Sequence, residues 1–191
     1  MNAERHGGAC QAAPPPPPEP LTTLFERLSD GDATALSAVY ETAASEIHGL
    51  ALFRTRSAAD AADVVQDVFV KLAQQGAKLR AIRNPRAWLL TVTRRAAIDV
   101  LRKRSKDVEI EEAALLAGPG SVEEWRADAG RLSEALHRLS DQQREVLYLK
   151  HFSELSFAEI GKTVGVPTFT AASRYRLGLK RLRKMLDADD D

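Results

Sequence analysis

Hydrophobic residues along this chain recur at steps of three and four, which is the period of an α-helix. One such stripe runs from Leu36 to Phe53, and another runs from Val65 to Leu72. No segment longer than four residues alternates convincingly between apolar and polar positions as a half-buried strand does. The pattern therefore predicts an all-α fold.

Residues that favour helix ends divide this pattern into separate helices. Ser57 is a good N-cap for a helix that ends before Gly76, and Asn84 followed by Pro85 predicts the start of the next helix. That second helix carries Trp88, which lies on its apolar stripe and is therefore expected in the core rather than as a platform for stacked bases.

The C-terminal part of the chain contains a helix-turn-helix pattern. Ser156 and Glu159 have the spacing of a capping box, Gly165 permits a tight turn, and an Arg-rich helix is expected to begin near residues 168 and 169. In this motif the second helix enters the major groove of DNA. The buried stripe of that helix is predicted to be Ala172, Tyr175, Leu179, Leu182 and Leu186.

Polar and basic residues fall off this predicted stripe. The N-terminal turns of the helix should meet base edges and nearby phosphates, and later basic residues should meet the DNA backbone. The predicted contacts with duplex DNA are Thr170, Ser173, Arg174, Arg176 and Lys180.

Between residues 105 and 120 the helical pattern fails. This stretch is acidic and ends in Gly118-Pro119-Gly120, a strong helix breaker. We expect a disordered Pro-rich leader over residues 1–20, a first helical domain over 21–106, a flexible acidic linker over 107–120 and a second helical domain over 121–187.

Charge is divided along the chain, although 27 basic and 27 acidic residues cancel overall. Ten basic residues and one acid lie between residues 78 and 106, whereas eight acids and two bases lie between residues 107 and 134. Such blocks favour two anion-binding surfaces joined by an acidic connector. The alternative is two solvated helix faces that bind nothing.

The sequence gives little support to an enzyme or a metalloprotein. The single cysteine, Cys10, and four scattered histidines form no ligand cluster, and no Gly-rich phosphate loop is present, so we expect no metal and no cofactor. There is no apolar run of 18 residues, and the N-terminus lacks the apolar core of a secretory signal. These features predict a cytoplasmic protein without a membrane span.

Four segments in order resemble the extracytoplasmic-function (ECF) class of bacterial RNA polymerase sigma factors. They are DAADVVQDVFVKL, NPRAWLLTVTRRAAIDVLRKRSK, LSDQQREVLYLKHFSELSFAEIGKTVGVP and TAASRYRLGLKRLRKML, and the resemblance covers about residues 22 to 186. It implies that the first domain binds the clamp helices of the polymerase and the melted strand of the −10 element. The second domain would read the −35 duplex.

The resemblance also implies which residues act. The polymerase-binding face would consist of Asp60, Asp63, Gln66 and Asp67. An unpaired strand in a basic groove requires cations and polar groups, and the expected −10 contacts are Arg80, Arg83, Asn84, Arg94, Arg95, Arg102 and Lys103.

The sequence departs from the family pattern at two places. The pair Arg94-Arg95 stands where the family often has Arg-Asn, and the last helix begins Phe169-Thr170 where the family commonly has Gly-Thr. The expected partners are core RNA polymerase, promoter DNA and an anti-sigma factor, and the free chain is expected to be a monomer. The alternatives are a helix-turn-helix activator or repressor that binds duplex DNA without being a polymerase subunit, and a sigma-like chain that has lost promoter activity.

Overall fold

The computed structural model describes residues 19–107, 131–132 and 134–187, and these residues form helices and loops without a strand. The predicted all-α fold is thus confirmed for the described part of the chain. The predicted leader up to residue 18 and the predicted linker from residue 108 onward lie outside it.

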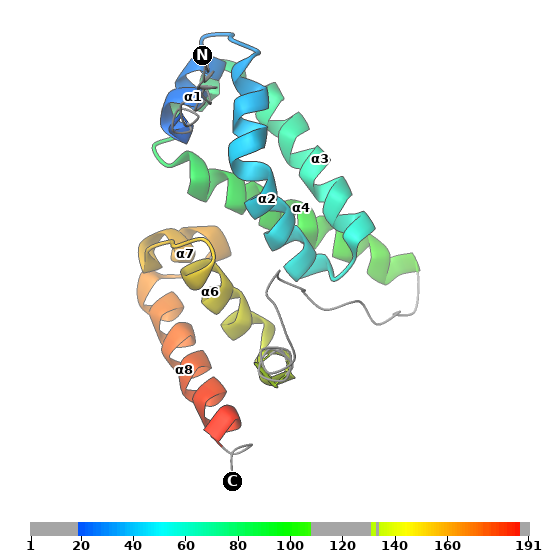
Figure 1. Cartoon of the computed structure of the whole chain (residues 1–191), viewed down its shortest axis with the longest axis vertical. Helices are drawn as coiled ribbons and strands as arrows, with labels where there is room; N and C mark the ends of the chain where they lie inside the picture. The colour runs from blue at the N-terminus through cyan, green and yellow to red at the C-terminus, as the bar shows by residue number, and fades with distance from the viewer. Residues whose placement is uncertain (1–18, 108–130, 133, 188–191) are drawn as a thin grey trace, which may run out of the picture.

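The N-terminal bundle consists of α1 (Leu21–Ser29), α2 (Ala35–Thr55), α3 (Ala58–Gln75), the short 3₁₀ helix η1 (Gly76–Ala81) and α4 (Pro85–Asp107) (Figure 1). The C-terminal bundle consists of α6 (Asp141–His151), α7 (Phe157–Val164) and α8 (Thr168–Asp187).

Side-chain caps place the starts of α3 and α4 where the sequence predicted them. The Ser57 hydroxyl accepts a hydrogen bond from the backbone N–H of Asp60 at 3.2 Å. The Asn84 side-chain oxygen accepts one from the backbone N–H of Ala87 at 2.9 Å, and Pro85 is the first residue of α4. Both caps satisfy backbone donors that have no partner within the first helical turn.

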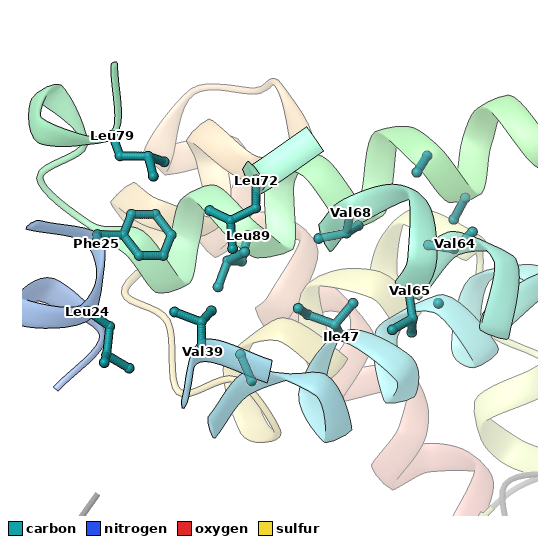
Figure 2. Close-up of a cluster of buried hydrophobic side chains, with 14 of the residues drawn as sticks. Leu24, Phe25, Val39, Ile47, Val64, Val65, Val68, Leu72, Leu79 and Leu89 are labelled. Atoms are coloured by element: carbon teal, nitrogen blue, oxygen red, sulfur yellow. The ribbon is translucent and has the colours of Figure 1, made fainter. Parts of the chain in front are cut away.

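The core of the N-terminal bundle lies between α1, α2, α3, η1 and α4. Figure 2 shows side chains from all of these elements turned toward one another. Trp88 of α4 is half-buried against this core and meets Phe25 edge-on, with ring centroids 6.0 Å apart. The prediction that Trp88 belongs to the core is therefore confirmed. The labelled core residues are Leu24, Phe25, Val39, Ile47, Val64, Val65, Val68, Leu72, Leu79 and Leu89.

A second hydrophobic cluster joins the two bundles. Leu50 of α2 and Leu90 of α4 are buried together with residues of α6, α7 and α8, rather than with the first core. The C-terminal bundle thus completes its core on the surface of the N-terminal one. The C-terminal members of this cluster are Val146, Leu149, Leu155, Ile160, Val164 and Ala171.

The helix-turn-helix of α7 and α8 has the predicted capping box and turn. The Glu159 backbone N–H donates to the Ser156 hydroxyl at 3.3 Å, and the Ser156 backbone N–H donates to the Glu159 carboxylate at 2.7 Å. The hydrogen bond from the Ser156 side chain is the main reason that the pKa of Glu159 is lowered. Gly165 ends α7 in the left-handed region, with φ +75°, where a side chain would be strained.

The buried face of α8 differs from the predicted stripe. Ala171 is buried and Ala172 is only half-buried, so the prediction of Ala172 as the first core position is wrong. Gly178 is also buried, and a Cβ there would lie 3.2 Å from the Leu147 side chain. A glycine adds nothing to a hydrophobic pattern, yet its small size lets α8 approach α6 closely. The sequence pattern therefore could not show where the two helices meet.

Candidate nucleic-acid and polymerase interfaces

One face of α8 points away from the helices that support it. The helix packs on α6 and α7, and in Figure 1 it lies on the side of them that is remote from α2 and α3. Residues four, three and four positions apart share a helix face. We define the α8 reading face as Phe169, Ser173, Arg176 and Lys180, which lies opposite the buried Ala171 and Gly178.

The charge on and beside this reading face is positive. Arg176 and Lys180 are exposed, whereas Thr170 and Arg174 are half-buried along its side. No acidic residue occurs in α8 before Asp187. Within the part of the chain that the structure describes, neither Arg174 nor Arg176 nor Lys180 has a hydrogen bond or an ion pair from its side chain. Their charge can therefore act on an outside anion such as a phosphate.

Specific contacts fix α8 in place behind this face. Arg181 donates to the side-chain oxygen of Gln143 at 3.2 Å. The Tyr175 ring packs on Phe157 with centroids 5.3 Å apart, and its hydroxyl lies 3.2 Å from Nε2 of His151. These contacts hold the reading face in a fixed orientation relative to α6 and α7.

Gly161 sets the close approach of α7 to the turn. A Cβ at this position would lie 2.7 Å from the backbone oxygen of Val166 and 3.4 Å from the backbone nitrogen of Thr168. Gly161→Ala should therefore lower the free energy of unfolding by about 1–3 kcal/mol, because the obstructing atom is backbone and the turn must shift. Urea unfolding followed by circular dichroism measures this change. Ala158→Gly, at an exposed position of the same helix, is the control, and it should cost no more than about 1 kcal/mol. A wild-type midpoint for Gly161→Ala would contradict the role of this contact.

The predicted −10 residues differ in what surrounds them. Arg95 and Arg102 lie seven residues apart on one exposed face of α4, and Arg102 pairs with Asp99 of that face at 3.4 Å. Lys103 and Arg83 are exposed as well. Arg80, on η1, is exposed and forms an ion pair with Asp30 at the end of α1.

Arg94 and Asn84, by contrast, bind the C-terminal bundle. Arg94 Nε donates to the Glu145 carboxylate of α6 at 2.8 Å, and Arg54 of α2 lies 3.5 Å from the same oxygen. The Glu145 side chain is 4% exposed, so this ion pair is largely removed from water. The Asn84 side chain donates to the carboxylate of Glu159, the residue that closes the capping box of α7.

Aromatic packing adds to the contact between the two bundles. Tyr148 of α6 stacks on Phe53 of α2 with ring centroids 4.5 Å apart and on Phe152 at 5.0 Å. A Cβ on Gly49 would lie 2.7 Å from the Tyr148 hydroxyl, so the ring fits against a glycine of α2. Burial is the main cause that raises the pKa of Tyr148 to about 12.

The predicted polymerase-binding residues lie on α3. Asp63, Gln66 and Asp67 are exposed on one face of the helix. Asp60, near the start of α3, is half-buried and pairs with Arg104 of α4 at 3.3 Å. Exposed Val70 continues the face of Asp63 and Asp67. Val70 is not among the predicted residues, which are all polar, although the sequence already shows its spacing from Asp63 and Asp67.

Neither a metal site nor a membrane span is found in the described residues. Their His, Cys, Asp and Glu side chains form no group of three that could hold a metal ion. None of their helices combines the length and the apolar character that crossing a bilayer requires.

The capped α7, the tight turn and the cationic α8 define a helix-turn-helix protein, and a separate helical bundle carries an acidic face. Comparison with known families gives two separate matches, one in each of the two bundles. Residues 39–107 match Sigma-70 region 2, and residues 135–184 match Sigma-70, region 4.

Similar proteins include the ECF RNA polymerase sigma factor RpoE of Cereibacter sphaeroides, which is 31% identical over 80% of this chain and 87% of its own length. The ECF RNA polymerase sigma factor SigK of Mycobacterium ulcerans is 26% identical over 92% of this chain and 98% of its own. The chain belongs to the ECF sigma factors of RNA polymerase, the initiation factors that direct the polymerase to promoters. A duplex-binding activator or repressor is not favoured, because both sigma-70 regions match this chain.

Solved structures with the same fold include two protein complexes. The sigma factor RpoE in complex with the anti-sigma factor NepR from Bartonella quintana is 27% identical, has a TM-score of 0.65, and is matched over 78% of this chain and 95% of its own. CnrH in complex with the cytosolic domain of CnrY is 22% identical, has a TM-score of 0.63, and is matched over 88% of this chain and 97% of its own. At 22% identity, the similarity to CnrH supports only the assignment of the fold.

Proposed function

We propose that this sigma factor binds core RNA polymerase through the exposed face of Asp63, Gln66 and Asp67, with Asp60 at the N-terminal end of the same helix. Three acceptor-rich side chains on one rigid helix suit a basic protein surface, because complementary charge speeds association and rejects wrong partners. Val70 supplies an apolar position on that face. The division into a domain over residues 21–106, a linker over 107–120 and a domain over 121–187 belongs to this proposal.

The observation that carries the DNA-binding part of the proposal is the open, positively charged face of α8. Arg176 and Lys180 project from a helix that α6 and α7 hold from behind. We assign contacts with the −35 duplex to this face and to Thr170 and Arg174 beside it. Base edges would be met mainly by the N-terminal turns, and phosphates by Lys180.

The melted strand of the −10 element would lie on the N-terminal bundle. The exposed cations Arg83, Arg95 and Lys103 suit a backbone that carries one negative charge per nucleotide. Arg80 and Arg102 would exchange their present carboxylate partners for phosphates. Arg94 would reach the strand only after α4 separates from Glu145, so its use requires the two bundles to move apart. Asn84 is exposed and would exchange the Glu159 carboxylate for the strand.

We also infer an anti-sigma partner, a cytoplasmic location and a monomeric free state. The relative RpoE of Bartonella quintana is bound by the anti-sigma factor NepR, which supports a partner of this kind. We assign the chain no catalytic residue, metal or cofactor, because the chemistry of transcription belongs to the polymerase that it would direct.

Run-off transcription tests the proposal. Bacterial core RNA polymerase is mixed with the purified chain on a promoter library, and new start sites are expected that core polymerase alone does not use. If the mixture starts transcription nowhere new, the proposal fails. A regulator that acts without being a subunit would instead protect duplex DNA by itself, with a footprint of two half-sites.

Arg174→Ala and Arg176→Ala should weaken promoter use without affecting assembly. Each loses a DNA contact worth about 1–3 kcal/mol, which corresponds to a decrease of about 5- to 150-fold in transcription at subsaturating promoter. Size-exclusion chromatography with core polymerase checks assembly, and Arg138→Ala, an exposed arginine outside α8, is the control. Wild-type promoter use by both variants would contradict the assignment of α8.

A further inference from the structure

We propose that Phe169 contacts the methyl group of a thymine in the −35 duplex and thereby determines one base of the promoter sequence. The inference rests on the proposed function of α8. Phe169 is not among the DNA contacts that the sequence predicts.

The Phe169 ring is in an unusual position for a large apolar side chain. It is 74% exposed, the highest value among the exposed large hydrophobic residues of the described chain. No other described aromatic ring packs on it. The fold therefore gains little from this phenyl group, since the apolar face of α8 is buried on its opposite side at Ala171 and Gly178.

The location of Phe169 is that of a base-reading side chain. It is the second residue of α8, and it shares the reading face with Ser173, Arg176 and Lys180. In a helix the Cα–Cβ bond tilts toward the N-terminus, so the ring of this second residue projects toward the N-terminal end of α8. The N-terminal residues of a recognition helix are those that meet base edges in the major groove. Lys180, further along the same face, would contact phosphates and hold the helix in the groove.

The chemistry of the ring selects thymine among the bases. A phenyl group neither donates nor accepts a conventional hydrogen bond, so it cannot pair with the polar groups on the edges of guanine, adenine or cytosine. Thymine presents a C5 methyl group in the major groove, and apolar contact with that methyl is an established mode of base readout. Burial of one methyl group corresponds to about fourfold tighter binding of thymine than of the same base without its methyl group.

A promoter library randomised in the −35 element provides the first test. Holoenzymes formed with the wild-type chain and with Phe169→Ala transcribe the library, and the enriched sequences are compared. Thymine should be enriched at one position by the wild type and lose that enrichment in Phe169→Ala, with the other positions unchanged. Leu177→Ala is the matched control, because Leu177 is also exposed, at 53%, but lies two turns further along α8.

Replacement of that thymine by uracil then removes only the methyl group. Transcription by the wild-type holoenzyme at subsaturating promoter should fall about fourfold, whereas Phe169→Ala should be insensitive to the replacement. Phe169→Leu keeps an apolar side chain and should retain most of the sensitivity.

The outcomes separate this inference from the proposed function. If the wild-type holoenzyme enriches a −35 sequence and Phe169→Ala enriches the same one, the role of Phe169 is wrong and the function of α8 stands. Equal sensitivity of wild type and Phe169→Ala to uracil also overturns the methyl contact. If the wild-type holoenzyme enriches no −35 sequence, the assignment of α8 to the −35 duplex is itself wrong.

Discussion

Replacement of Asp63 and Asp67 by lysine is expected to abolish assembly of this chain with core RNA polymerase while leaving the fold intact. Both side chains are exposed on α3, and the structure gives neither an ion pair with another described residue. The change therefore costs the isolated chain little. At a basic partner surface, however, it replaces two attractions with two repulsions, and like charges that face each other across an interface cost several kcal/mol.

The affinity for core polymerase should accordingly fall by about 100-fold or more, as measured by competition for core polymerase or by fluorescence anisotropy of a labelled chain. Glu26→Lys combined with Glu134→Lys is the control, because it makes the same change in net charge at exposed positions outside α3. If both double variants lose affinity equally, net charge is responsible and not the α3 face. Undiminished binding of the α3 variant would remove that face from the proposed interface.

Glu145→Ala is expected to lower the free energy of unfolding by about 3–5 kcal/mol. The substitution leaves Arg54 and Arg94 without the carboxylate that they share, and the Arg94 side chain is only 21% exposed. Removing one partner from a buried ion pair carries this cost because an uncompensated charge stays in a poorly solvated place. The buried Nε of Arg54 already has no hydrogen-bond partner among the described residues, so it cannot compensate for the loss.

Denaturant unfolding followed by circular dichroism and by tryptophan fluorescence measures this effect. Asp99→Ala is the control, since it removes the exposed partner of Arg102 within α4 and should change stability by less than about 1 kcal/mol. Two separated transitions in Glu145→Ala would indicate that the bundles unfold independently once the pair is gone. Equal stability of Glu145→Ala and wild type would show that the ion pair does not hold the bundles together.

Local signals in the sequence were enough to predict most helix boundaries. Ser57, Asn84 and Ser156 act through backbone groups within three residues of themselves, so their effect is fixed before any tertiary contact forms. The turn before α8 follows in the same way from Gly165. These features, together with the order of the four segments, define the helix-turn-helix and the family.

Contacts between distant segments could not be predicted from the sequence. Arg94 lies in a block of basic residues, and the sequence therefore predicts a DNA contact for it. Its helix face also carries Leu90, which is buried against the C-terminal bundle. Whether that arginine meets a phosphate or Glu145 depends on how the bundles pack, and a helical period contains no such information. Phe169 is not part of the predicted buried stripe of α8 and carries no charge or hydrogen-bonding group, so nothing in the sequence pattern marks it as a DNA contact until its exposure is known.

The shared carboxylate of Glu145 also limits how sigma factors of this family can recombine. A chimera that joins the N-terminal bundle of this chain to the C-terminal bundle of a relative keeps Arg54 and Arg94 but inherits the relative's residue in place of Glu145. An acceptor at that position permits the exchange, whereas an apolar or basic residue leaves two arginines facing each other. Positions 54, 94 and 145 should therefore change together during evolution, although they lie far apart in the sequence.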